Sequence, residues 1–203
     1  MPLSRRQVAM AAIILLKYLF IVMLTIRNSL INIWNRVYYI TYYHTDIPIQ
    51  MAIMNNERFD VFVWVVETFP NRLEFNNGLN DMTPLLYAAM KHMPFPYIKL
   101  LVDKGANLMA SEDMYHMNVL HFLIDYWVQV YQLSGTIIEN SSNPLFEDIT
   151  KSVQYIVQRN RGILNVPNNQ NITPIQIVME MAPKLIDYLN LGDGTVVVRR
   201  SYS

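Results

Sequence analysis

The apolar residues between positions 83 and 105 follow two successive helical patterns. Thr83 is a favourable N-cap, and Pro84 stands at the first helical position, where a backbone N–H would have no helical partner. Apolar side chains then recur at i, i+3 and i+4 spacing, which places them on one face of a helix. The first set is Leu85, Ala88 and Ala89; the second, after a turn with Pro94 and Pro96, is Ile98, Leu101 and Val102. Gly105 is suited to end the second helix, so the pattern predicts two antiparallel helices.

The opening of this pattern recurs at three other places in the chain. Copies in register with Thr83 begin at Ile47, 36 residues earlier, at Asn118, 35 residues later, and at Thr173, a further 55 residues on. A period of this size indicates an array of stacked helical units. We therefore expect about four units, which together span residues 44–191.

The third unit is longer than the others. Its excess of about 20 residues over the usual period predicts a polar insertion near residues 132–150, which contains Gly135 and Pro144. The second helix of this unit is expected to resume at Ser152. The last unit is expected to close with a helix that begins at Pro183, and residues 192–203 form a C-terminal tail.

Residues 81–113 closely resemble one ankyrin repeat, with Thr83-Pro84-Leu85 opening the first helix and Gly105-Ala106-Asn107 following the second. The resemblance implies an all-α fold, an ankyrin-like helical solenoid of about four short, degenerate repeats, as in some viral and parasite proteins. It also implies a structural role for His121, whose ring would hydrogen-bond between neighbouring loops. The glycine that the family carries between paired helices is absent here, so the shape of those turns is left open.

A hydrophobic segment precedes the array. Residues 8–26 contain 17 apolar residues out of 19, interrupted by Lys17 and Thr25. The length suffices to cross a bilayer. The alternative is a buried cap on the solenoid, because Arg6, Lys17 and several asparagines gather on one side of a helical wheel. Residues 1–43 are therefore predicted to be a hydrophobic N-terminal helical cap or a membrane anchor.

Composition narrows the classes of function. The chain of 203 residues is 52% hydrophobic and 16% charged, with 16 basic and 16 acidic residues. A balanced charge provides no general attraction for a phosphate backbone, so nucleic acid is not an expected partner. The chain has no cysteine, which excludes disulfides and thiolate ligands for zinc.

The sequence shows no catalytic or metal-binding pattern. His116 and His121 are five residues apart with no cysteine nearby, a spacing that does not suit a shared metal site. The acidic residues of the array fall at predicted loops and helix ends, where capping explains them; they include Asp81, Asp103, Glu112, Asp113 and Asp125. We expect no enzyme, no cofactor and no metal.

Stacked repeats present an extended surface made of loop tips and first helices. The family resemblance places Asn80, Asp81, Met114, Tyr115 and His116 at the tips, and Tyr87, Met90 and Lys91 on a first helix. Tyrosine and methionine suit protein contacts, since they provide large or adaptable apolar area. The expected function is that of a cytoplasmic, non-enzymatic adaptor or inhibitor that binds a protein partner. The alternative is a scaffold or receptor tail anchored in a membrane through residues 8–26.

Overall fold

The described part of the chain is helical. The computed structural model describes residues 47–76, 82–134 and 144–189, together with Val22, Met23, Ile26 and Leu30. The helices are α2 (Pro48–Met54), α3 (Phe59–Thr68), η1 (Pro70–Arg72), α4 (Pro84–Met90), α5 (Phe95–Asp103), α6 (Val119–Ser134), α7 (Pro144–Arg159), η3 (Arg161–Asn165), α8 (Pro174–Met181) and α9 (Pro183–Tyr188). Within these ranges, strand pairing is limited to an isolated antiparallel bridge between Ser111 and Asn118. The prediction of an all-α chain is confirmed.

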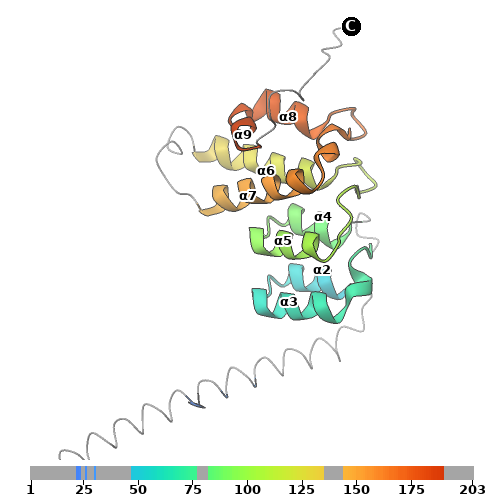
Figure 1. The fold of residues 1–203 in the computed structure, drawn as a ribbon, viewed down its shortest axis with the longest axis vertical. Coiled ribbons are helices and arrows are strands. Elements are labelled where there is room, and N and C mark those ends of the chain that lie inside the picture. The colour runs from blue at the N-terminus through green and yellow to red at the C-terminus, as the bar shows by residue number, and fades with distance from the viewer. Residues whose placement is uncertain are drawn as a thin grey trace, which may run out of the picture. The chain divides into compact units, whose positions relative to one another are not determined.

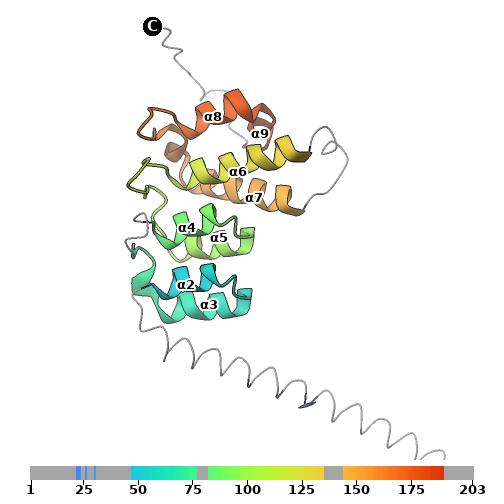
Figure 2. The ribbon, with the colours of Figure 1, turned by 180° about the vertical axis from the view of Figure 1, so that it is seen from behind.

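The helices are arranged as four successive pairs, α2–α3, α4–α5, α6–α7 and α8–α9. The first helices α2, α4, α6 and α8 contact one another in sequence, and so do the second helices α3, α5, α7 and α9 (Figure 1). The view from behind shows the same order of pairs (Figure 2). Each pair therefore packs against its neighbours in this order.

The first helices begin at the positions that the repeat pattern predicts. The Thr83 hydroxyl accepts the N–H of Leu86 (3.4 Å), and the Asn118 side chain accepts that of Leu120 (3.0 Å). Thr173 forms a full capping box with Gln176. Ile47 has no side-chain cap. Asparagine thus replaces threonine as a cap at Asn118, whereas α2 depends on packing at its N-terminus.

The turns inside the first two pairs use left-handed residues that are not glycine. Asn56 follows α2 with φ +50°, and His92 follows α4 with φ +56°. At each turn the N–H groups of the left-handed residue and of the residue after it donate to helix carbonyls, for example from Glu57 to Ala52 (3.0 Å) and from Met93 to Ala88 (3.0 Å). This is the Schellman arrangement, in which glycine is usual and asparagine is tolerated.

The third pair is longer than its neighbours. The insertion expected near residues 132–150 is helical at both described ends, because α6 continues to Ser134 and α7 begins at Pro144 rather than at Ser152. Residues 135–143 lie outside the described residues. Trp127 holds the two long helices together: it is completely buried, and its indole N–H donates to the Thr150 hydroxyl (3.2 Å).

The core continues from pair to pair along the stack. It contains fully buried side chains from both helices of a pair, among them Ile49, Phe62, Leu85, Ile98, Leu101, Leu120 and Ile156. Burying one such side chain stabilises the fold by roughly 1.5–3 kcal/mol. Ala88 and Ala89 of α4 are also buried, and their small size allows neighbouring helices to approach closely.

The hydrophobic N-terminal segment falls largely outside the described residues. Val22, Met23, Ile26 and Leu30 are helical and exposed. The rest of residues 1–43, on which the prediction of a cap or an anchor depends, is not described, and neither is the tail at 192–203. Among the described helices, none combines the length and the apolar character that crossing a bilayer requires.

Gly105 offers a direct test of the turn geometry. It follows α5 at φ +95°, and a Cβ atom added there would meet nothing within 4 Å. Because no clash occurs, the Gly105→Ala substitution measures only the free-energy cost of holding a residue other than glycine in this left-handed backbone conformation. We expect it to lower the free energy of unfolding by roughly 1–2 kcal/mol, measured by urea denaturation. Asn56→Gly, at the equivalent turn after α2, should leave stability within about 0.5 kcal/mol of the wild type. Equal stability losses in the two variants would contradict this account.

Candidate functional site

Glu112 organises the loop between α5 and α6. The residue is only 2% exposed, and its carboxylate accepts the N–H groups of Met114 (2.6 Å), Tyr115 (2.7 Å) and Met117 (3.1 Å). The Glu112 N–H in turn donates to the carbonyl of Met117 (3.1 Å), which closes residues 112–117 into a hairpin around the carboxylate. We call these residues the tip loop. Hydrogen bonds to a charged acceptor are stronger than neutral ones, so one side chain fixes the shape of this loop.

The loop between η3 and α8 is built in a similar way and is joined to the tip loop. The Asn168 side-chain oxygen accepts the N–H groups of Gln170 and Ile172, both at 3.0 Å. Asn169 connects the two loops. Its backbone N–H donates to the carbonyl of Tyr115 (2.9 Å) and its Nδ2 to that of Met114 (2.9 Å). The tip loop is therefore held from within by Glu112 and from the side by Asn169.

His121 makes a second connection between these loops. Its Nδ1 accepts the N–H of Asn118 (3.1 Å), which places the ring proton on Nε2, and Nε2 donates to the carbonyl of Ile172 (3.0 Å). Burial lowers the pKa of the His121 imidazole, while the bond to Ile172 opposes that shift. The ring is neutral and structural, as the family resemblance implied.

The earlier loops are joined by equivalent contacts. Gln50, at the position in α2 that His121 occupies in α6, donates from Nε2 to the carbonyl of Phe75. Glu74 Oε1 accepts the N–H of Asn107 (2.7 Å), which connects the loop after η1 to the loop after α5. Burial raises the pKa of Glu74, and the bond from Asn107 opposes that rise. Successive loops along the stack are thus joined by side chain to backbone hydrogen bonds.

The predicted tip residues that the structure describes are exposed on this braced loop. Met114 is 59% exposed and Tyr115 is 50% exposed. His116 is also exposed and takes the left-handed conformation, with φ +54°. Ile172, on the adjoining loop, is a further exposed apolar residue that the sequence reasoning did not select. Asn80 and Asp81 lie outside the described residues.

The predicted residues Tyr87 and Met90 are half-buried on the outer face of α4, and the exposed Lys91 follows as the C-cap of that helix. They are four, seven and eight residues after the N-cap Thr83, so they share one helix face. The same positions on the other first helices are also exposed or half-buried. We call the whole set the first-helix stripe: Met51, Met54, Asn55, Tyr87, Met90, Lys91, Phe122, Asp125, Tyr126, Ile177, Glu180 and Met181.

The sequence reasoning missed most of this stripe, although the signal was present in the repeat register. Once Ile47, Thr83, Asn118 and Thr173 are aligned as N-caps, the members on α2, α6 and α8 follow directly. Contacts across the stripe include the His92 ring, which is stacked on Tyr126 with centroids 3.6 Å apart. This stacking connects the end of α4 to α6.

Three acidic residues have roles other than the expected capping. Glu112 organises a loop and caps no helix, and Asp125 lies inside α6, where it accepts a hydrogen bond from Gln129 (2.7 Å). Asp103 ends α5, where a negative charge opposes the helix dipole. It is compensated by Lys99 on its own helix and by Tyr155 and Arg159 of α7, with Arg159 Nη2 at 3.0 Å. The hydrogen bond from Lys99, followed by that from Tyr155, lowers the pKa of Asp103.

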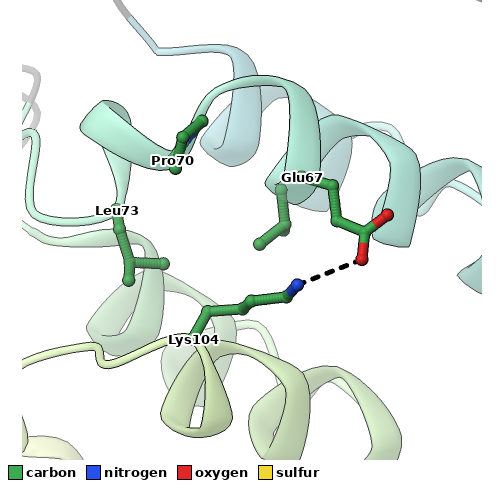
Figure 3. A pocket seen from close by; sticks show the side chains of 5 residues that line it. Glu67, Pro70, Leu73 and Lys104 are labelled. Atoms are coloured by element: carbon green, nitrogen blue, oxygen red, sulfur yellow. Dashed lines mark hydrogen bonds and ion pairs between the residues drawn. The ribbon is translucent and has the colours of Figure 1, made fainter.

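A small hollow opens between α3, η1 and the end of α5 (Figure 3). It measures about 250 Å³ and is lined by Val66, Glu67, Pro70, Leu73 and Lys104. The Lys104 ammonium and the Glu67 carboxylate are 3.0 Å apart beside it, so the two charged groups of the lining neutralise each other. Among the described residues, no three histidine, aspartate or glutamate side chains gather as metal ligands.

The role of Glu112 can be tested by changing one atom of its carboxylate. In Glu112→Gln, an amide N–H₂ replaces one acceptor oxygen and faces backbone donors that then have no partner. We expect a loss of roughly 1–3 kcal/mol in the free energy of unfolding. Hydrogen exchange should also become faster at the amides of Met114, Tyr115 and Met117. Asp113→Asn makes the same chemical change at the exposed neighbouring position and should alter neither property. Unchanged exchange in Glu112→Gln would contradict the proposed bracing.

The buried imidazole of His121 predicts a pH dependence of stability. Because folding lowers its pKa, the unfolded chain binds more protons, and stability falls as the pH drops below the ordinary histidine value near 6.5. Burial lowers the pKa of His92 as well. In His121→Gln, which copies Gln50 of α2, the loss of stability between about pH 8 and about pH 5 should be smaller than in the wild type. Urea denaturation at both pH values measures this, and equal losses would refute the contribution of His121.

Comparison with known proteins gives little beyond this geometry. No family model matches the chain, and no curated protein matches it. A similar solved structure is described as a predatory endopeptidase from Bdellovibrio bacteriovorus in complex with an immunity protein. The match has 21% sequence identity and a TM-score of 0.36, and it covers 70% of this chain and 78% of the other. A likeness of this extent assigns no function to the chain.

Proposed function

We propose that this protein is an ankyrin-type repeat protein that binds a protein partner and acts as a non-enzymatic adaptor or inhibitor. The repeat assignment is supported by the four helix pairs, by the N-caps at Thr83, Asn118 and Thr173, and by the hairpin of the tip loop. It is further supported by the ring of His121, which connects neighbouring loops as the family resemblance implies.

The observation that carries the binding proposal is the exposure of Met114 and Tyr115 on a loop that is rigidly held. Large apolar side chains exposed in this way lose little conformational freedom on binding when their backbone is already fixed. Tyrosine is also among the residues that contribute most to protein interfaces. Glu112 and Asn169 provide the fixed backbone here. The tip loop is therefore held more firmly than a solvent-exposed connection between helices needs to be, and this suits it to contact a protein.

The non-enzymatic part of the proposal rests on how the two buried titratable groups at the tip loop, Glu112 and His121, are used. The Glu112 carboxylate accepts three backbone N–H groups, and both ring nitrogens of His121 are occupied by backbone partners. These bonds use the donor and acceptor positions that general acid or base catalysis would need free. Both side chains maintain the conformation of the loops.

A photo-crosslinking amino acid at position 115 tests whether the tip loop contacts a partner. Benzoylphenylalanine keeps an aromatic ring at that position and should form a discrete adduct with one protein in the cell of origin. The same amino acid at Gln158, an exposed position on α7, is the control and should form none. The double variant Met114→Ala/Tyr115→Ala should weaken partner binding at least about tenfold, since such side chains often contribute more than 1 kcal/mol each.

The thermal stability of the double variant distinguishes lost contacts from lost structure. Both side chains are exposed, so the melting temperature should remain close to that of the wild type. A protein that melts normally, forms no adduct from position 115 and binds its partner equally well with Met114 and Tyr115 removed would disprove the proposal.

A further inference from the structure

The first-helix stripe contains one column of apolar side chains that runs the length of the stack. Four residues after each N-cap stand Met51, Tyr87, Phe122 and Ile177, and all four are half-buried. They come from α2, α4, α6 and α8, which contact one another in that order. A continuous apolar track therefore crosses the four first helices.

The adjacent column changes in character halfway along the stack. Seven residues after each N-cap stand Met54 and Met90 on α2 and α4, then Asp125 and Glu180 on α6 and α8. On this side of the track the stripe is consequently apolar over the first two pairs and acidic over the last two, whereas the column eight residues after each N-cap, on the other side, contains Asn55, Lys91, Tyr126 and Met181. Lys91, the only basic residue of the stripe, belongs to the apolar half, where its ammonium lies 5.6 Å from the centre of the Tyr87 ring.

Neither acidic residue of the stripe forms an ion pair with another described residue. Burial lowers the pKa of the His92 imidazole, and Asp125 lies close enough to that ring to oppose the shift. Every ion pair between described residues lies on the second-helix side of the stack, on α3, α5 and α7 or at their ends. Asp125 accepts a hydrogen bond from the neutral Gln129 side chain, and Glu180 is exposed. Two exposed carboxylates without a lysine or arginine partner among the described residues therefore stand on the adjacent helices α6 and α8.

We propose that the first-helix stripe binds a segment of a partner polypeptide that carries apolar side chains and is basic at one end. The apolar side chains would cover the track, and a lysine or arginine would lie over Asp125 and Glu180, where charge complementarity favours it. Packed helices lie about 8–10 Å apart, so the four helices span about 30 Å. An extended segment of about nine residues covers that distance. This inference rests on the proposed binding function and adds the chemistry and polarity of the partner.

The test uses the full chain and a library of twelve-residue peptides displayed on phage. Selected peptides should combine apolar residues with lysine or arginine grouped at one end. The double variant Asp125→Asn/Glu180→Gln should bind a selected peptide about tenfold more weakly than the wild type at low salt, and the difference should shrink as salt is raised. Met90→Ala should also weaken binding, because it removes apolar area beside the track.

A matched control removes two negative charges elsewhere. Asp148→Asn/Asp187→Asn changes the charge of α7 and α9 by the same amount and should leave the affinity of the selected peptide unchanged. The inference is overturned if no peptide is enriched, if enriched peptides lack basic residues, or if both double variants bind equally well. If binding is lost with Tyr115→Ala but not with Asp125→Asn/Glu180→Gln, the stripe inference fails while the proposed function stands. If position 115 forms no adduct and the removal of Met114 and Tyr115 leaves binding unchanged as well, the proposed function fails with it.

Discussion

The fold depends on the burial of each short helix pair against the next. Helices such as α2 and α4 have seven residues, well below the length at which an isolated helix is stable in water. Their apolar residues become fully buried because the partner helix and the neighbouring pairs cover them, as with Ile49, Leu85 and Leu120. This requirement fixes the register of every pair, since a helix rotated about its axis would expose its apolar face. Stability is therefore distributed along the stack as a series of contacts between neighbouring pairs.

The fixed register also determines which positions can serve recognition. In each first helix the positions two and five residues after the N-cap are buried, while those four, seven and eight residues after it face outward. The inward positions keep an apolar character, and the outward ones range from Met54 and Met90 to Asp125 and Glu180. The loops follow the same division: Glu112, Asn168 and His121 are occupied by backbone hydrogen bonds, whereas Met114 and Tyr115 remain exposed.

The sequence was informative where a residue type has one favoured structural role. Thr83-Pro84 and Thr173-Pro174 mark helix starts, and Gly105 marks a helix end, because capping chemistry is local.

The turns at Asn56 and His92 were not predicted, since neither residue requires a left-handed conformation and only the tertiary packing imposes it there. The lengths of α6 and α7 were underestimated from the sequence. The polar residues near 132–150 are typical of a loop, but some of them extend these two helices, which are held together by Trp127. The bracing by Glu112 was missed although its partners are only two, three and five residues further on, because an acidic residue in a loop was interpreted as a helix cap. Tyr87, Met90, Met114 and Tyr115 were selected as surface residues from the repeat register alone.

The unusual length of the third pair has a consequence for the order of folding. The α6–α7 hairpin has about twice the helical length of its neighbours and its own buried indole, so it can form more native contacts before any other pair joins it. In a linear array, structure grows outward from the most stable unit. The chain is therefore expected to condense around residues near Trp127 and Thr150 and to add pairs toward both ends. Of the described helices, α2 has no side-chain cap and belongs to the pair furthest along the stack from this nucleus, so we expect it to be added last and to open first.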